Sequence, residues 1–174
     1  MVTRQEIEND NRFFINSVTL TDILRRVNIK RYELRHVKIG RLRHNYGKLM
    51  AIYETIPYKF LDNPTDEKCI KDYLEYCDIP SAKKDNPDRS IDCYNNLMNH
   101  FSVEEYNIQK GIIVIDQFYK IQEGLHRSCI LLKKYGSQHK VQVLYIVTTH
   151  NFFSWIKSYI RMIVFDIKHF TFLK

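Results

Sequence analysis

The order of hydrophobic and polar positions predicts a well-defined unit in the second half of the chain. Residues 112–115 and 141–147 are hydrophobic runs with the length and β-branched content of buried strands. Residues 116–118 predict a tight turn, and residues 119–122 a strand that returns from it. A helix is expected over residues 125–135, ending at a glycine preceded by Lys-Lys-Tyr. Strands separated by a single helix indicate an α/β or α+β layer in which the helix covers the sheet.

Weaker patterns run through the first hundred residues. Residues 1–16 form a polar lead-in. The segments that follow are expected, in chain order, to be a helix over 22–27, a strand near 32–39, an extended segment over 55–61, a helix over 67–77, a turn-rich loop over 79–89 and a helix over 91–101. Thr19 or Thr21 would cap the first of these helices, and Asp88 or Ser90 the last.

Residues 151–174 predict a helix with two contrasting sides. Aromatic and aliphatic residues fill a wide side, while serines and basic residues lie opposite. Charges at Lys157, Arg161, Asp166 and Lys168 interrupt the hydrophobic sequence, so a membrane-spanning segment is not expected. A helix lying at a membrane surface has this pattern. We favour the simpler interpretation, a terminal helix packed on the core or on a partner, because any docked helix is amphipathic.

Length and charge narrow the possible functions. A chain of 174 residues is expected to form one domain with a terminal appendage. Its 27 Lys and Arg residues against 20 Asp and Glu residues give a net charge of +7, which favours nucleotides, nucleic acid or acidic lipid as partners. Many basic residues fall in residues 25–48. That span fits a nucleic-acid backbone, although a solvated surface is the commoner explanation.

The four cysteines and seven histidines do not suggest a metal centre. Neither a Cys-x-x-Cys pair nor a His-Glu-x-x-His pair occurs in the sequence. The first residues are polar and have no apolar signal segment. We therefore expect free thiols in a reducing cytoplasm rather than a disulfide framework, with Cys129 in the core.

The junction between the returning strand and the helix has the most distinctive sequence of the chain, Glu123-Gly124-Leu125-His126-Arg127-Ser128. The first amides of a helix lack partners and its dipole is positive there, so this junction favours an anion. The guanidinium of Arg127 adds a planar group suited to phosphate. The sequence therefore predicts a phosphate or carboxylate site with a carboxylate close by.

Each residue of this junction also has a simple structural interpretation. Gly124 suits a turn with positive φ, and the same freedom lets a phosphate approach the backbone at Leu125. Arg127 is expected to contact phosphate rather than only to pair with Glu123. His126 either faces solvent, contacts phosphate or stabilises the charge that is transferred.

The remaining candidates surround this turn. Glu123 either balances the helix dipole, takes a hydroxyl proton or holds Mg²⁺. Ser128 is expected to cap the helix or to donate a hydrogen bond to phosphate. Asp116 is expected to form the hairpin turn rather than to act in catalysis. Glu54 and Tyr58 are candidates to approach the junction from the first part of the chain.

The block from about residue 90 to residue 147 resembles the ParB/sulfiredoxin-like superfamily. The likeness rests on the strand, turn and strand over 112–122, the Glu-Gly-Leu-His-Arg turn, the helix after it and the strand over 140–146. Within the superfamily, the chain is most similar to ParB-like proteins found among bacterial cell-surface polysaccharide genes. The resemblance implies an α+β fold with a small mixed sheet and helices packed on it, to which a C-terminal amphipathic helix is added.

The resemblance also implies a function for the turn. Superfamily members hold nucleotide phosphates there, and their activities include sulfinic-acid reduction, CTP hydrolysis coupled to DNA clamping and phosphorylation of a free amino acid. Leu125 stands where sulfiredoxins have cysteine, so sulfiredoxin activity is not expected. His126 replaces an arginine of the partition ParB proteins, and too few residues follow Val147 for their helix-turn-helix domain. Glu123 replaces the usual aspartate.

The implied organisation is a helical and extended region over 1–89 that contributes to the site, a core over 90–148 and an amphipathic helix over 149–174. The expected activity is phosphoryl transfer from ATP or another nucleoside phosphate, with Mg²⁺, to a small hydroxyl-bearing acceptor. Catalysis is assigned to Glu123, His126 and Arg127, and nucleotide binding to residues 124–128. The expected location is the bacterial cytoplasm, either free or peripheral at the inner membrane.

Two other functions stay open on the sequence alone. One is a ParB-like module or nuclease that binds nucleic acid. The other is a non-catalytic accessory protein that docks to a membrane or an enzyme through residues 151–174.

Overall fold

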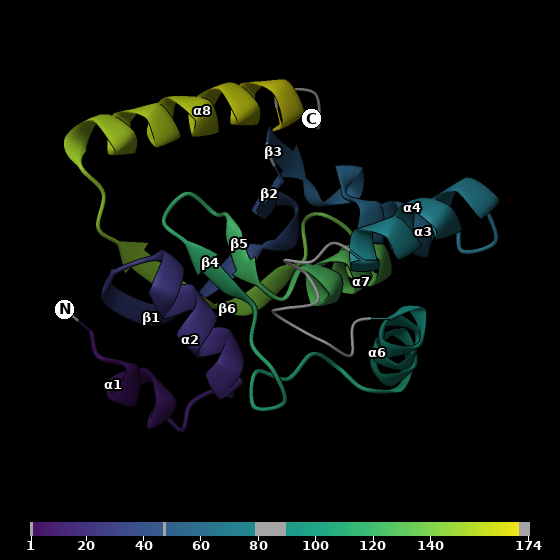
Figure 1. Ribbon diagram of the computed structural model, residues 1–174, viewed down its shortest axis with the longest axis horizontal. Helices are drawn as coiled ribbons and strands as arrows, with labels where there is room; N and C mark the ends of the chain where they lie inside the picture. The colour runs from purple at the N-terminus through teal and green to yellow at the C-terminus, as the bar shows by residue number, and fades with distance from the viewer. Residues whose placement is uncertain (1, 47, 79–89, 171–174) are drawn as a thin grey trace.

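The computed structural model describes residues 2–46, 48–78 and 90–170, so the loop expected over 79–89 lies outside the described residues. Figure 1 shows a central sheet with helices around it and one long helix, α8, running along the top. The architecture is α+β with a small mixed sheet, as the sequence predicts.

The main sheet has four strands in the order β1-β6-β4-β5. They are β1 (Ile29–Lys38), β4 (Val114–Asp116), β5 (Ile121–Glu123) and β6 (Lys140–Thr148). β6 pairs antiparallel with β1 and parallel with β4, while β4 and β5 form an antiparallel hairpin. Because β1 pairs with β6 along its length, the expected N-terminal region and the expected core share one sheet.

β6 is buried on both faces, which explains its continuous hydrophobic run. Val141, Val143 and Tyr145 belong to a core cluster on one face, and Leu144 and Ile146 belong to a second cluster on the other. Successive side chains of a strand point to opposite faces, so a strand covered on both sides needs apolar residues at every position.

Four helices cover the face of the sheet that carries the larger core. They are α3 (Ile56–Asp62), α4 (Glu67–Asp78), α6 (Ile91–Val103) and α7 (Leu125–Tyr135). α7 follows β5 after a single residue, and its bounds confirm the helix predicted from the sequence. α6 begins after Ser90, whose hydroxyl oxygen accepts a hydrogen bond from the Cys93 amide at 3.1 Å.

The extended segment predicted over residues 55–61 is wrong, because α3 occupies these positions. Proline reads as a helix breaker in a helix interior, but Pro57 lies in the first turn of α3. The amides of a first turn have no partner within the helix, so proline costs no helical hydrogen bond there.

The opposite face of the sheet is covered by α1 (Arg4–Glu8) and α2 (Ser17–Arg26). Both differ from the sequence prediction. α1 lies inside the expected polar lead-in, where Thr3 and Glu6 form a capping box. α2 begins earlier than predicted, because Asn16 caps it by accepting a hydrogen bond from the Val18 amide at 2.8 Å.

A separate hairpin, β2 (Arg43–Tyr46) and β3 (Lys48–Ala51), is absent from the sequence prediction. Its first residue bridges to Lys120 beside β5, which brings the hairpin next to the main sheet. The short helical turns η1 (Ile39–Arg41) and η2 (Ile52–Glu54) lead into and out of it.

α8 (Phe152–Phe170) begins after Asn151, whose side chain accepts a hydrogen bond from the Ser154 amide at 2.8 Å. Phe165 is buried, and Asp166 forms an ion pair with the fully buried Arg43. The apolar side of this helix was expected to pack on the core or on a partner, and most of it is exposed and does not pack on the core. Among the described helices, none is long and apolar enough to cross a membrane.

Candidate functional site

A cleft of about 780 Å³ opens beside the junction of β5 and α7. Its wall is built from α2, the hairpin residue His44, α4, α6 and residues 121–127. Elements from both faces of the sheet therefore meet there. The volume lies within the range of pockets that hold small-molecule ligands.

Gly124 sets the geometry of the junction. Its backbone is left-handed, with φ of 88° and ψ of 27°, and it occupies the cap position of α7. A Cβ at this position would lie 3.0 Å from Cγ1 and 3.1 Å from Cα of Ile113. Only glycine meets both demands without strain. The cap residue Gly124 has no side chain that could bond the first amides of α7.

Arg127 is held at the edge of the cleft by backbone and carboxylate groups. Its Nη1 donates a hydrogen bond to the Ile112 carbonyl at 3.4 Å and lies 3.8 Å from Oε1 of Glu123. The guanidinium also packs against Gly111, where a Cβ would approach Nη2 to 2.7 Å. Gly111, which directly precedes the hydrophobic run over residues 112–115, therefore makes room for the arginine.

His126 lies in a group of tyrosines. Its Nε2 is 3.0 Å from the Tyr73 hydroxyl, and its ring meets the Tyr94 ring edge-on with 4.7 Å between centroids. Burial raises the pKa of Tyr94 far above its usual range, and the Tyr94 hydroxyl donates to the Pro57 carbonyl at 3.1 Å. These contacts hold the imidazole at the cleft wall.

Of the other predicted site residues, Glu123 and Leu125 line the cleft and Ser128 does not. Glu123 lines the cleft and is half-buried beside Arg127. Leu125 also lines it, but its side chain belongs to the core, so only its backbone is offered to a ligand. Ser128 is fully buried and lies outside the lining, and its hydroxyl donates to the Gly124 carbonyl at 2.9 Å. We therefore leave Ser128 out of the proposed phosphate site.

Several cleft residues were not identified from the sequence. Asp22 and Arg26 come from α2, where they form an ion pair at 2.6 Å, and His100 comes from α6. They lie far from residue 123 in sequence, and no local motif marks them. Glu54 and Tyr58, the candidates from the first part of the chain, do not line the cleft.

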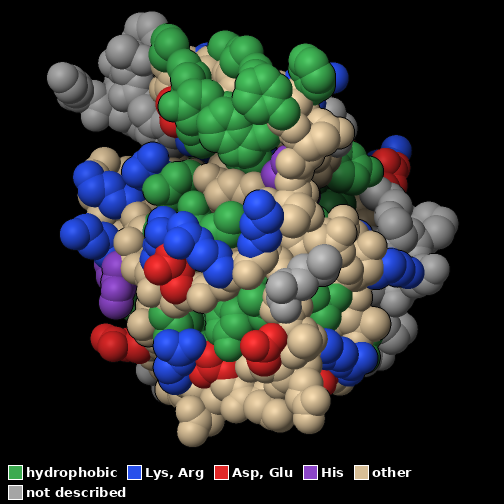
Figure 2. Space-filling model, turned by 90° about the vertical axis from the view of Figure 1, so that its left-hand side faces the viewer, with side chains coloured by type: hydrophobic (Ala, Val, Ile, Leu, Met, Phe, Trp, Pro, Cys, Tyr) green, Lys and Arg blue, Asp and Glu red, His purple; other side chains and the backbone are tan. Residues whose placement is uncertain are grey.

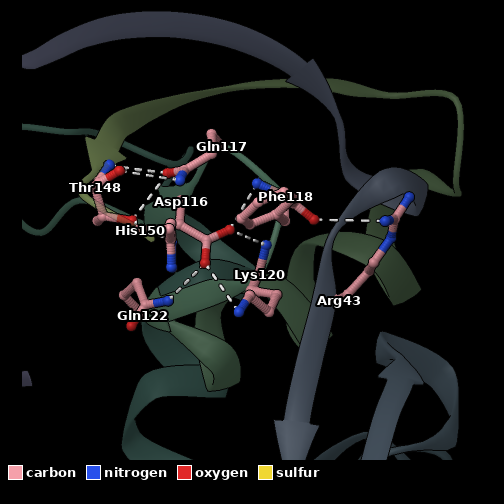
Figure 3. Close-up of polar contacts among 8 residues, drawn as sticks. All are labelled: Arg43, Asp116, Gln117, Phe118, Lys120, Gln122, Thr148 and His150. Atoms are coloured by element: carbon pink, nitrogen blue, oxygen red, sulfur yellow. Dashed lines mark hydrogen bonds and ion pairs between the residues drawn. The ribbon is translucent and has the colours of Figure 1, made fainter. Parts of the chain in front are cut away.

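A buried carboxylate braces the strands behind the junction (Figure 3). Asp116 accepts hydrogen bonds from the amides of Phe118 at 2.8 Å and Lys120 at 3.1 Å, and from the Gln122 side chain at 3.2 Å. It therefore holds the β4–β5 turn, as the sequence predicts. Burial raises the pKa of Asp116 above its usual value, and the nearby Lys120 partly offsets this.

All four cysteines are free thiols, and Cys129 is fully buried as expected. Burial raises the pKa of Cys129 to about 12, which keeps it a neutral thiol at physiological pH. Among the residues the structure describes, no three His, Cys, Asp or Glu side chains are grouped to hold a metal ion.

Three basic residues of the 25–48 span have partners within the fold or are buried. Arg25 and Arg26 both pair with Asp22, and Arg43 is buried beneath α8. Part of the positive charge in this span is therefore used within the fold.

Comparisons with protein-family models, with curated proteins and with solved structures gave no match to this chain.

Proposed function

We propose that the cleft binds a nucleoside phosphate through residues 124–127 and transfers a phosphoryl group to a small hydroxyl-bearing acceptor. The observation that carries the proposal is the position of Arg127. It is fixed at the start of α7, where Gly124 contributes no capping side chain, on the wall of a cleft with room for a nucleotide. Backbone amides and a guanidinium together are the groups that proteins use to neutralise phosphate oxygens.

The residues of the cleft would divide the work of phosphoryl transfer. This reaction depends on positioning and charge neutralisation more than on covalent chemistry. Arg127 and the first amides of α7 would bind the phosphates, and His126 would stabilise charge on the group in transit. Glu123 would either accept the proton of the acceptor hydroxyl or help to hold Mg²⁺. Magnesium bound with a nucleotide takes most of its ligands from phosphate and water, so one or two carboxylates suffice.

Asp22 and Arg26 give the cleft a second pair of opposite charges across from the junction. Such a mixed wall suits a polar acceptor with several hydroxyl groups, which can both donate and accept hydrogen bonds. The resemblance to ParB-like proteins of polysaccharide gene clusters favours a sugar or a polyol as that acceptor.

Nucleotide binding is tested by thermal unfolding with ATP, ADP, CTP and GTP, each with and without Mg²⁺. A ligand present at a thousand times its Kd stabilises the folded protein by about 4 kcal/mol. For a domain of this size that shift corresponds to roughly 8–16 °C in Tm. We expect at least one nucleotide to give a shift of this order.

Arg127→Ala is the decisive variant, and Lys38→Ala is its control because it removes one exposed cation outside the cleft. Arg127→Ala should lose most of the nucleotide-induced shift, while Lys38→Ala should keep it. Equal shifts in wild type and Arg127→Ala would show that the phosphates bind elsewhere. Nucleotide consumption should also require an added acceptor, which a coupled assay with candidate polyols measures.

A further inference from the structure

The long C-terminal helix is turned with its apolar side away from the rest of the protein. The partly or fully buried residues of α8 are Ser154, Ile156, Ser158, Met162, Phe165, Asp166 and His169. All but Ile156 lie on one side of the helix, and this stripe contacts the body through Phe165, Asp166 and His169. Most of this stripe is polar or mixed. Packing on the body therefore does not account for the hydrophobic residues of α8.

The outward side carries the large apolar residues. Their exposed fractions are 70% for Phe152, 81% for Phe153, 43% for Trp155, 41% for Tyr159, 54% for Ile160, 39% for Ile163, 60% for Val164 and 61% for Ile167. Figure 2 shows hydrophobic side chains gathered across the top of the molecule, where α8 lies. An exposed apolar area of this extent marks a binding surface.

The charges on α8 are arranged around this surface with one sign. Lys157, Arg161 and Lys168 are exposed and lie on one edge of the apolar side, at intervals of four and seven residues. The only carboxylate of the helix, Asp166, is turned toward the body and paired with Arg43. No described acidic side chain of α8 accompanies the outward cations.

We propose that α8 docks this protein on an anionic lipid surface, lying in the plane of the membrane with its apolar side inserted. Aromatic and aliphatic side chains on one side with lysine and arginine at the edge are the pattern of helices that bind at the lipid interface. A second copy fits less well. In an antiparallel two-fold pair, the three cations of each helix would lie beside the like charges of its partner. Anionic headgroups neutralise these cations instead.

The test is flotation of the full-length protein with vesicles of phosphatidylcholine and phosphatidylglycerol in equal amounts, and with phosphatidylcholine alone. Wild type should float with the mixed vesicles and much less with the neutral ones. Each cation close to an anionic surface strengthens binding about fivefold, so Lys157→Gln/Arg161→Gln/Lys168→Gln should weaken it on the order of 100-fold. Added salt should also weaken binding to the anionic vesicles, because it screens the attraction between the cations and the headgroups.

Ile160→Ser/Ile167→Ser removes apolar surface and should weaken vesicle binding by at least about tenfold. Leu74→Ser is the matched control, since Leu74 is 46% exposed on α4, and it should bind like wild type. All these side chains are exposed, and circular dichroism at the working temperature verifies that each variant is folded.

Size-exclusion chromatography of the same proteins tests whether a second copy of this chain covers the apolar side of α8 instead. Wild type that does not float but elutes as a dimer, and becomes a monomer in Ile160→Ser/Ile167→Ser, would overturn the proposal in favour of a second copy. Wild type that stays monomeric and unbound would also overturn it, as would equal binding to neutral and anionic vesicles.

Discussion

At the start of α7, the space available to single atoms decides which side chains fit. Gly111 leaves the volume that the guanidinium of Arg127 fills, and Gly124 leaves the volume filled by Ile113. Gly124 is also left-handed, a backbone state that costs other residues about 1–2 kcal/mol. The position of the candidate phosphate site therefore depends on two missing Cβ atoms as much as on the arginine.

The buried carboxyl of Asp116 should make the stability of the protein depend on pH. Burial raises its pKa, so the folded protein binds a proton on this carboxyl more tightly than the unfolded chain does. The stability that Asp116 contributes therefore falls as the pH rises from about 4, the value for an unfolded aspartate, through its folded pKa. Asp116→Asn keeps an acceptor oxygen for the amides of Phe118 and Lys120 but carries no charge.

Across that pH range, the free energy of unfolding of Asp116→Asn should rise relative to that of wild type as the pH rises, because only wild type loses the contribution of the Asp116 carboxyl. Urea denaturation of both proteins at a series of pH values measures the difference. If the difference in free energy of unfolding between the two proteins is constant with pH, or comes to favour wild type as the pH rises, the buried carboxyl is not protonated more readily in the folded protein.

Residues whose role depends on their immediate sequence neighbours were predicted correctly. Gly124 and Gly136 both have positive φ, as their positions at the ends of a predicted helix suggest, and Asp116 forms its turn. Asp22, Arg26 and the tyrosines around His126 were not predicted, because these residues reach the cleft only through tertiary packing. Ser128 shows the converse case: it belongs to the motif in sequence, yet its hydroxyl bonds within the helix.

At the scale of elements, α8 is attached to the hairpin β2–β3 and to η2 by a few specific contacts. Asp166 pairs with Arg43, Phe165 lies under the Arg43 guanidinium with 5.0 Å to the ring centroid, and Nδ1 of His169 is 2.8 Å from the Tyr53 hydroxyl. Burial lowers the pKa of Arg43 despite its carboxylate partner. The ion pair therefore holds a charge that the rest of the fold would otherwise leave uncompensated.

Asp166→Ala should destabilise the protein by about 3 kcal/mol, because removing one partner of a buried ion pair leaves the other charge without compensation. Chemical denaturation measures this loss. Arg43→Met/Asp166→Ala removes both charges and should recover most of the stability. If the double variant is no better than Asp166→Ala, the cost lies in lost helix packing and not in the buried charge.

Element prediction succeeded where hydrophobic periodicity was strong and failed where a turn or a cap decided the outcome. β6 and α7 were predicted within a residue or two of their observed bounds. α3 was missed because its proline lies in a first turn. The hairpin β2–β3 was missed because each strand has only 4 residues and β2 is mostly polar. For α8 the sequence predicted the helix, but only the structure shows which side is covered.

At the scale of the whole molecule, β6 organises the fold. It has β1 on one side and β4 on the other, and it contributes side chains to the core clusters on both faces. Figure 1 shows it at the centre, with α1 and α8 at the periphery. Opening β6 would require both cores to come apart, whereas α1 buries only Ile7 along its length.

Amide hydrogen exchange should follow this arrangement. The amides in the middle of β6 should exchange only through global unfolding, and those of α1 on the order of 100-fold faster or more through local opening. Exchange of the native protein followed by mass spectrometry of its peptides measures both. Equal protection in α1 and β6 would mean that the N-terminal helix and the sheet unfold as one unit.

The sequence by itself determined that strands are covered by a helix in one layer, and it determined the strands and the helix around the Glu-Gly-Leu-His-Arg turn. These depend on interactions between near neighbours: strand alternation, helix capping and the backbone freedom of glycine. Only the tertiary structure decided that β1 joins the main sheet, that α2, α4 and α6 complete the cleft, and that α8 turns its apolar side outward. Those outcomes arise from competition between distant surfaces for the same buried space, and no local pattern records which surface wins.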